Sequence, residues 1–158
     1  MNKLPSEIIK AGAVAGTLDI ITACTYYCIK TGGSNPLNVL KFVASGVFGK
    51  DAIAGGSTMI IAGLALHYFI AFAFTAFFFW LFPKVKVLST NKIGTGVVYG
   101  IFAWMVMNLL IVPLSNVAAR PFNLANSVIN AVILIVCIGI PLSFMANKFY
   151  RERIKLRQ

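Results

Sequence analysis

Charged side chains are scarce in this sequence, and acidic ones most of all. Only 11% of the 158 residues are charged, and four acidic residues stand against 14 basic ones. A soluble globular domain carries about 25% charged residues, so this composition excludes an ordinary soluble protein. The few acidic residues are not paired as two carboxylates placed for general acid–base catalysis would be.

Histidine and cysteine are also few, which limits metal and redox chemistry. The single histidine, His67, excludes a haem held by two histidines. Cys24, Cys28 and Cys137 all fall within apolar segments, unlike the cysteines of an extracellular disulfide framework. Cys24, Cys28 and His67 lack an evident fourth ligand for zinc. No Ser/His/Asp spacing or phosphate-binding glycine loop is present, so we expect no metal, no cofactor and no enzymatic activity.

Long hydrophobic runs, in contrast, are abundant, because hydrophobic residues make up 59% of the chain. A helix needs about 20 apolar residues to cross a bilayer. Four segments meet that length, at 11–29, 59–82, 93–112 and 124–145. Asp19 interrupts what would be a signal-peptide core, so we expect the first segment to be retained. The sequence therefore predicts an all-α integral membrane protein, a single domain over residues 1–158 containing a bundle of four transmembrane helices.

A shorter helix is predicted at 36–48, between the first two apolar segments. Asn35 is a favourable N-cap, Pro36 suits the first helical position, and Gly49 suits the C-terminal stop. The apolar residues of this stretch fall on one face, so we expect an amphipathic interfacial helix along the membrane surface. It would serve as an anchor or lid, or alternatively as a gate or partner-binding element.

Basic residues flank the four segments unevenly, which predicts the orientation. The N-terminus, the second loop and the C-terminal tail hold ten Lys and Arg, against four in the other loops, namely Lys30, Lys41, Lys50 and Arg120. By the positive-inside rule, both termini are cytoplasmic. The basic ends are expected to meet anionic lipid headgroups, so the net charge of +10 does not indicate nucleic-acid binding.

Asp19 lies near the middle of the first apolar segment, where a carboxyl group costs several kcal/mol unless it is protonated, paired or hydrated. It shares a helical face with Gly12 and Gly16, so we expect it to face the bundle interior. Gly96 and Gly100 repeat the same small-residue spacing in the third segment. The sequence therefore predicts that the first and third helices pack against each other through these two glycine pairs.

Polar side chains from all four segments are expected to line one cavity that opens to the exterior. Counted along the helices from the cytoplasmic side, Asp19 lies at a depth of about 13 Å and several of the others at about 23 Å. Thr75 or Tyr99 is the expected hydrogen-bond partner of Asp19. The alternative is interhelical hydrogen bonding that only holds the bundle together, at about 0.6 kcal/mol per bond. The candidate cavity or proton site comprises Asp19, His67, Tyr26, Asn108, Asn126 and Asn130.

The sequence resembles the YagU-like family of small bacterial inner-membrane proteins. The residues that carry the resemblance are His67 and Ile70, FPKVK at 82–86, a glycine-rich third segment that reaches Met107, IVPLS at 111–115, and the SNP start of the interfacial helix. The resemblance implies a multi-pass protein of the bacterial inner (cytoplasmic) membrane without an assigned reaction. It brings no catalytic motif.

Three functions remain open from the sequence. The preferred one is a non-catalytic accessory or assembly component that contacts a membrane-protein partner or a second copy of the chain. The second is a small proton-linked transporter or conductor, because Asp19 and His67 are side chains that change protonation inside the membrane. The third and weakest is a quinone- or lipid-binding protein that uses a cavity beside His67.

Overall fold

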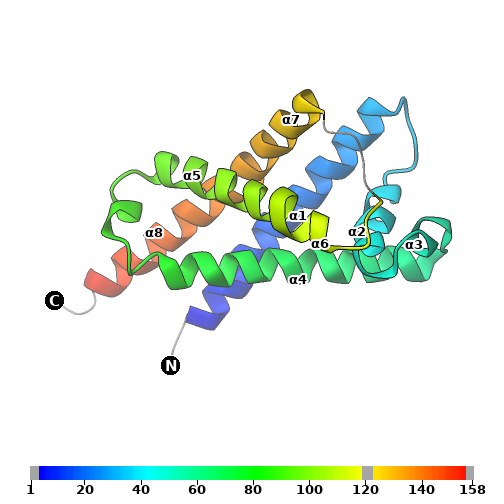
Figure 1. Ribbon diagram of the computed structural model, residues 1–158. Helices are drawn as coiled ribbons and strands as arrows, with labels where there is room; N and C mark the ends of the chain where they lie inside the picture. Colours follow the sequence, from blue (N-terminus) through cyan, green and yellow to red (C-terminus); the bar gives the residue numbers. More distant parts are fainter. Residues whose placement is uncertain (1–3, 119–122, 156–158) are drawn as a thin grey trace.

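The computed structural model describes residues 4–118 and 123–155, apart from the side chains of residues 154 and 155. Lys3, Arg120 and Arg157, which enter the charge count above, lie outside this part of the chain. All regular elements of the described residues are helical (Figure 1). Four helices are long and apolar enough to cross a membrane, namely Leu4–Lys30, Ser57–Leu81, Lys92–Leu114 and Leu124–Arg153. The prediction of an all-helical membrane protein is confirmed to this extent.

The first two long helices are uninterrupted, whereas each of the others contains a π-helical segment just before a proline. Pro113 and Pro141 follow these segments. Proline lacks an N–H, and its ring collides with the carbonyl of the preceding turn, so a widened turn accommodates it. The long helices consist of α1 (Leu4–Lys30), α4 (Ser57–Leu81), α5 (Lys92–Met105) with η2 (Val106–Ile111) and α6 (Val112–Leu114), and α7 (Leu124–Leu134) with η3 (Ile135–Gly139) and α8 (Ile140–Lys155).

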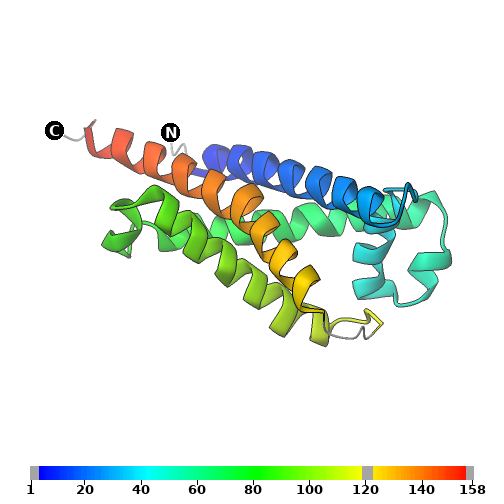
Figure 2. The ribbon, with the colours of Figure 1, turned by 90° about the horizontal axis from the view of Figure 1, so that it is seen from above.

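Three short helices connect the long ones: α2 (Asn38–Phe48), α3 (Asp51–Ala54) and η1 (Lys86–Ser89). Figure 2 shows both chain ends on one side of the molecule and α2 and α3 on the other. α2 packs directly on α4, because a Cβ added at Gly63 would overlap the carbonyl of Leu40. Asn116 closes the last turn of α2, with its backbone N–H 2.9 Å from the Gly46 oxygen. α2 is therefore held by contacts on both sides.

The small-residue face of α1 lies against α4. A Cβ added at Gly16 would lie 3.1 Å from the Ala71 Cβ, and one at Gly12 would lie 2.7 Å from Phe72 Cε1. Both glycines are buried, so their lack of a side chain allows the two helices to approach. The partner of this face is the second long helix rather than the third.

The small-residue face of α5 lies against η3 and the start of α8. A Cβ added at Gly96 would lie 2.8 Å from the Ile140 Cα, and one at Gly100 would lie 2.8 Å from the Ile135 backbone N. Gly139 faces the same two glycines from the other side. The predicted contact between the first and third helices is therefore wrong. Helical spacing identifies a face that permits close approach, but it does not identify the helix that lies against it.

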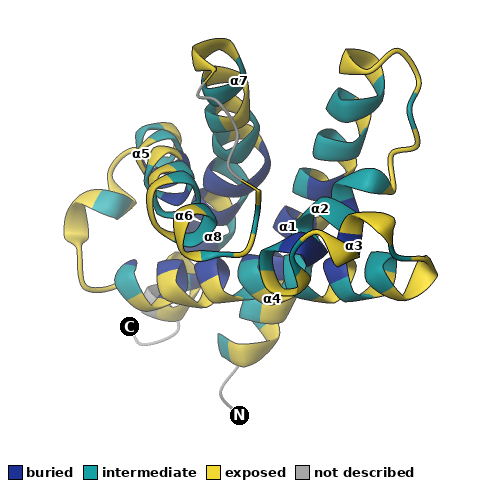
Figure 3. Cartoon of the chain, turned by 45° about the vertical axis from the view of Figure 1, so that its right-hand side comes forward, coloured by how far each residue is buried: buried dark blue, intermediate teal, exposed yellow. Residues whose placement is uncertain are grey.

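The buried core lies where the long helices meet, as the dark-blue residues of Figure 3 show. The Tyr99 hydroxyl donates to the Phe74 carbonyl at 2.6 Å, and its ring centre lies 4.4 Å from that of Phe78. The Tyr150 hydroxyl likewise donates to the Phe79 carbonyl at 2.7 Å. These bonds satisfy polar tips within an aromatic core and connect α4 to both α5 and α8.

Replacing Gly139 by alanine should destabilise the fold. The added methyl group would overlap the Gly96 carbonyl and lie 2.9 Å from the Gly100 N, and backbone atoms cannot rotate away. We expect the free energy of unfolding to fall by about 1–3 kcal/mol, measured by SDS titration of the protein in detergent micelles. Gly46→Ala is the matched control, because this glycine is also within a helix and its methyl would meet only Ser115 Cβ at 3.8 Å and Val117 Cγ2 at 4.0 Å, both ordinary contacts. Equal stability of the two variants would contradict the close contact.

Candidate functional site

Asp19 and His67 line the same cavity, which has a volume of about 70 Å³. The remaining wall is apolar and comes from α2 and from the second, third and fourth long helices. Both polar residues are half-buried. The structure thus brings together the two ionisable members of the predicted site. The apolar wall consists of Val43, Ile70, Ala71, Phe74, Ala103, Met107, Leu134 and Ile138.

His67 is positioned by the backbone of α1. Its Nε2 lies 2.8 Å from the Gly16 carbonyl oxygen. A carbonyl oxygen can only accept, so Nε2 must carry the proton of this hydrogen bond. The Tyr68 ring stands edge-on at 5.5 Å between ring centres. In the neutral imidazole, Nδ1 is then the nitrogen that can take up a proton.

Asp19 has no direct partner among the described residues: none donates a hydrogen bond to its carboxyl group or forms an ion pair with it. The expected partners bond elsewhere, since the Thr75 hydroxyl donates to the Ala71 carbonyl at 2.8 Å and the Tyr99 hydroxyl donates to Phe74. The prediction of Thr75 or Tyr99 as a partner is therefore wrong. His67 is the ionisable residue that lines the same cavity.

A second hydrogen bond between α1 and α4 lies directly beside the first. The hydroxyl groups of Thr17 and Tyr68 are 2.8 Å apart. Each of these residues follows a member of the Gly16–His67 pair in the sequence, so two adjacent bonds attach α1 to α4. The sequence analysis missed both Thr17 and Tyr68. The sequence feature that could have identified them is their position directly after Gly16 and His67, which were already candidates.

Tyr26 and Asn126 form a separate polar cluster, between the last turns of α1 and the first turns of α7. The Tyr26 hydroxyl donates to Asn126 Oδ1 at 3.2 Å, and Lys30 Nζ donates to the same oxygen at 2.6 Å. The Lys30 ammonium also lies 5.7 Å from the centre of the Tyr26 ring. This cluster connects two helix ends and does not line the Asp19–His67 cavity.

The last two members of the predicted site lie in neither group. Asn108 Nδ2 donates to the carbonyl of Trp104 at 3.0 Å, within its own helix. Asn130 is exposed, and its side chain makes no hydrogen bond with any described residue. The structure therefore does not bring the six predicted side chains into one cavity. Equal depth along four helices says nothing about the direction in which each side chain points.

The two cysteines of α1 face the connection that follows it. Cys24 Sγ donates to the Pro36 carbonyl at 3.5 Å, and Cys28 Sγ donates to the Ser34 carbonyl at 3.1 Å. Within the described residues, no three His, Cys, Asp or Glu side chains gather into a group that could hold a metal ion.

No protein-family model, curated protein or solved structure matches this chain. The resemblance to the YagU-like family stays a prediction, and the functional argument depends on the residues themselves.

Replacing Asn126 by alanine should loosen the contact between α1 and α7. It removes the oxygen that accepts from both Tyr26 and Lys30. We expect the free energy of unfolding in micelles to fall by about 0.6–1.7 kcal/mol, the range measured for interhelical bonds in membranes. Asn130→Ala, one turn further along α7, is the control and should leave the stability of the monomer unchanged. Equal losses for the two variants would contradict a specific role of Asn126.

Proposed function

We propose that the protein is a non-enzymatic, proton-linked transporter or conductor in which Asp19 and His67 exchange a proton inside the membrane. The observation that supports this proposal is their position in one otherwise apolar cavity among four membrane-length helices. Ionisable side chains at bilayer depth are costly, and they are typical of ion pathways and proton relays. A purely packing role would be served at lower cost by an amide or a hydroxyl group.

The His67 hydrogen bond defines the direction of the exchange. Because Nε2 donates to Gly16, a proton from the Asp19 carboxylic acid would go to Nδ1, giving a carboxylate and an imidazolium. The transfer leaves the total charge of the cavity unchanged. The cavity volume of about 70 Å³ has room for a few water molecules, which can connect the two side chains. The nearby thiol of Cys137 already donates to the Thr22 hydroxyl, at 3.3 Å.

The same volume disfavours the quinone- or lipid-binding alternative at this site. Ligand pockets for small molecules usually enclose about 300–1,000 Å³, well above the space beside His67. A cavity of about 70 Å³ accommodates water but no quinone ring.

A second candidate function is that of an accessory or assembly component, and Asn130 supports it. An exposed amide within a membrane-length helix lacks a hydrogen-bond partner unless another chain supplies one. In this alternative, a second copy or a membrane-protein partner covers α7, and the His67–Gly16 bond serves only to join α1 to α4.

We further propose a bacterial inner (cytoplasmic) membrane location with both termini in the cytoplasm and the four long helices as a transmembrane bundle. The position of both chain ends on one side of the molecule supports an even number of crossings (Figure 2). Lys84 and Lys86 follow α4 near that side, as the positive-inside rule requires. α2 would then lie at the exterior interface as an amphipathic helix, with Val47 and Phe48 exposed to lipid.

Asp19→Asn should abolish pH-dependent proton flux in proteoliposomes while leaving the protein folded. The amide keeps the shape of a protonated carboxyl group but cannot release a proton. Asp51→Asn, in the exposed first turn of α3, is the control and should keep the wild-type flux. Flux is measured with a pH-sensitive dye trapped inside the vesicles. Absence of flux in the wild type, or full flux in Asp19→Asn, would contradict the conductor and favour the accessory component.

A further inference from the structure

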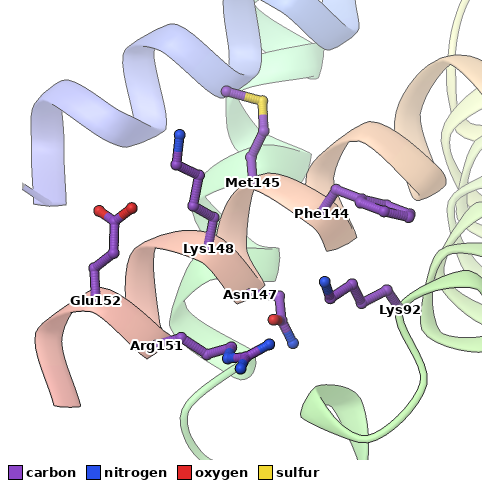
Figure 4. A pocket seen from close by; sticks show the side chains of 7 residues that line it. All are labelled: Lys92, Phe144, Met145, Asn147, Lys148, Arg151 and Glu152. Carbon is purple, nitrogen blue, oxygen red and sulfur yellow. The ribbon is translucent and has the colours of Figure 1, made fainter. Parts of the chain in front are cut away.

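A second, larger cavity lies where α8 passes the beginning of α5. Its volume is about 460 Å³, and it is lined by three basic side chains, one acidic side chain, one amide and two apolar side chains (Figure 4). The helices that line it, α8 and the beginning of α5, lie toward the side of the molecule that carries the chain ends (Figures 1 and 2). Its volume falls within the range of ligand pockets, unlike that of the Asp19–His67 cavity.

The cavity offers a site for an anion. In Figure 4, Lys92 and Arg151 lie on the two sides of Asn147. Lys92 is the first residue of α5, so the partial positive charge of that helix end adds to its ammonium group. Lys148 and Glu152 extend from α8 in another direction, and Glu152 is the one acidic residue of the lining. Lysine and arginine placed in this way are typical ligands of a phosphate group.

Asn147 adds a requirement for a hydrogen-bond donor. Its side chain is only 1% exposed, and its Nδ2 donates to the Ser89 carbonyl at 3.2 Å. Its Oδ1 is buried, and no described residue donates to it. A buried acceptor without a partner is uncommon in native proteins. Because an ionised phosphate oxygen cannot donate, a ligand that satisfies this acceptor carries a hydroxyl or an N–H group beside its phosphate.

The two apolar side chains of the lining lie toward the middle of the long helix. Phe144 precedes Asn147 on α8 by about one turn, whereas Met145 extends on the side of Lys148 (Figure 4). Phe144 is 45% exposed, and the Lys92 ammonium lies 5.4 Å from the centre of its ring. An acyl chain that follows the helix would therefore contact Phe144 while its phosphate meets Lys92 and Arg151.

We propose that this cavity binds an anionic phospholipid whose headgroup carries a hydroxyl group, as phosphatidylglycerol does. Lys92 and Arg151 hold the phosphate, a headgroup hydroxyl donates to Asn147 Oδ1, and the acyl chain lies along Phe144. This site is separate from Asp19 and His67, so it does not depend on the proton-linked function.

Native mass spectrometry of the full chain, purified without lipid, tests this proposal with short-chain ligands. Dihexanoylphosphatidylglycerol should bind more tightly than dihexanoylphosphatidylcholine, which has no net charge, and than dihexanoylphosphatidylmethanol, which lacks the headgroup hydroxyl. Lys92→Gln and Arg151→Gln should each weaken binding of the glycerol lipid by about fivefold. Lys86→Gln is the control, because this residue is exposed on η1 and does not line the cavity.

Each arm has a result that would overturn the proposal. Equal binding of the glycerol and choline lipids would contradict a site for an anionic lipid. Equal binding of the glycerol and methanol lipids would contradict a hydrogen bond from the headgroup hydroxyl to Asn147. An equal loss in Lys86→Gln would show that surface charge in general, rather than this cavity, attracts the lipid. If glycerol 3-phosphate competes as well as the lipid itself, the site belongs to a soluble phosphate ester.

Discussion

The hydrogen bond from His67 to the Gly16 carbonyl depends on the close approach of α1 and α4. An imidazole on α4 reaches the backbone of α1 at 2.8 Å because Gly12 and Gly16 present no side chain on that face. The bond fixes Nε2 as the ring nitrogen that carries the proton. Nδ1 is therefore the nitrogen that can accept a second proton. Side chains at these glycines would push α1 and α4 apart. His67 would then no longer reach the Gly16 carbonyl oxygen. Packing and proton chemistry therefore depend on the same contact.

α2 and the two π-helical segments bring apolar side chains to the wall of the cavity. Val43 comes from α2, and Met107 and Ile138 come from η2 and η3. α2 holds its position through Gly63 of α4 and through Asn116, whose Nδ2 donates to the Val47 carbonyl at 2.8 Å. Low polarity around Asp19 and His67 strengthens the electrostatic interaction between them, since little solvent is present to screen it.

The sequence predicted the helices well and their neighbours poorly. Apolar length predicted the four membrane-length helices, and Gly49 predicted the end of the short helix between the first two. That helix begins at Asn38 rather than at residue 36, because Leu37 and not Asn35 is its N-cap residue. The glycine spacing predicted which faces of α1 and α5 allow another helix to approach closely. Which helix packs there depends on the shape of both helix surfaces, and the spacing within one helix does not contain that information. Asp19 and His67 line one cavity, whereas Asn130 is exposed and Asn108 bonds within its own helix. The sequence did not predict this difference, because it does not fix the rotation of each helix about its own axis.

The most direct test is ¹⁵N NMR of the imidazole of His67, which gives one unambiguous signal pair because the chain has a single histidine. The account predicts that the neutral ring carries its proton on Nε2 and that the Nδ1 signal changes in Asp19→Asn, because the carboxyl group lines the same cavity. It predicts no such change in Asp51→Asn. A neutral ring protonated on Nδ1, or the same Nδ1 signal with and without the Asp19 carboxyl group, would contradict a shared proton site.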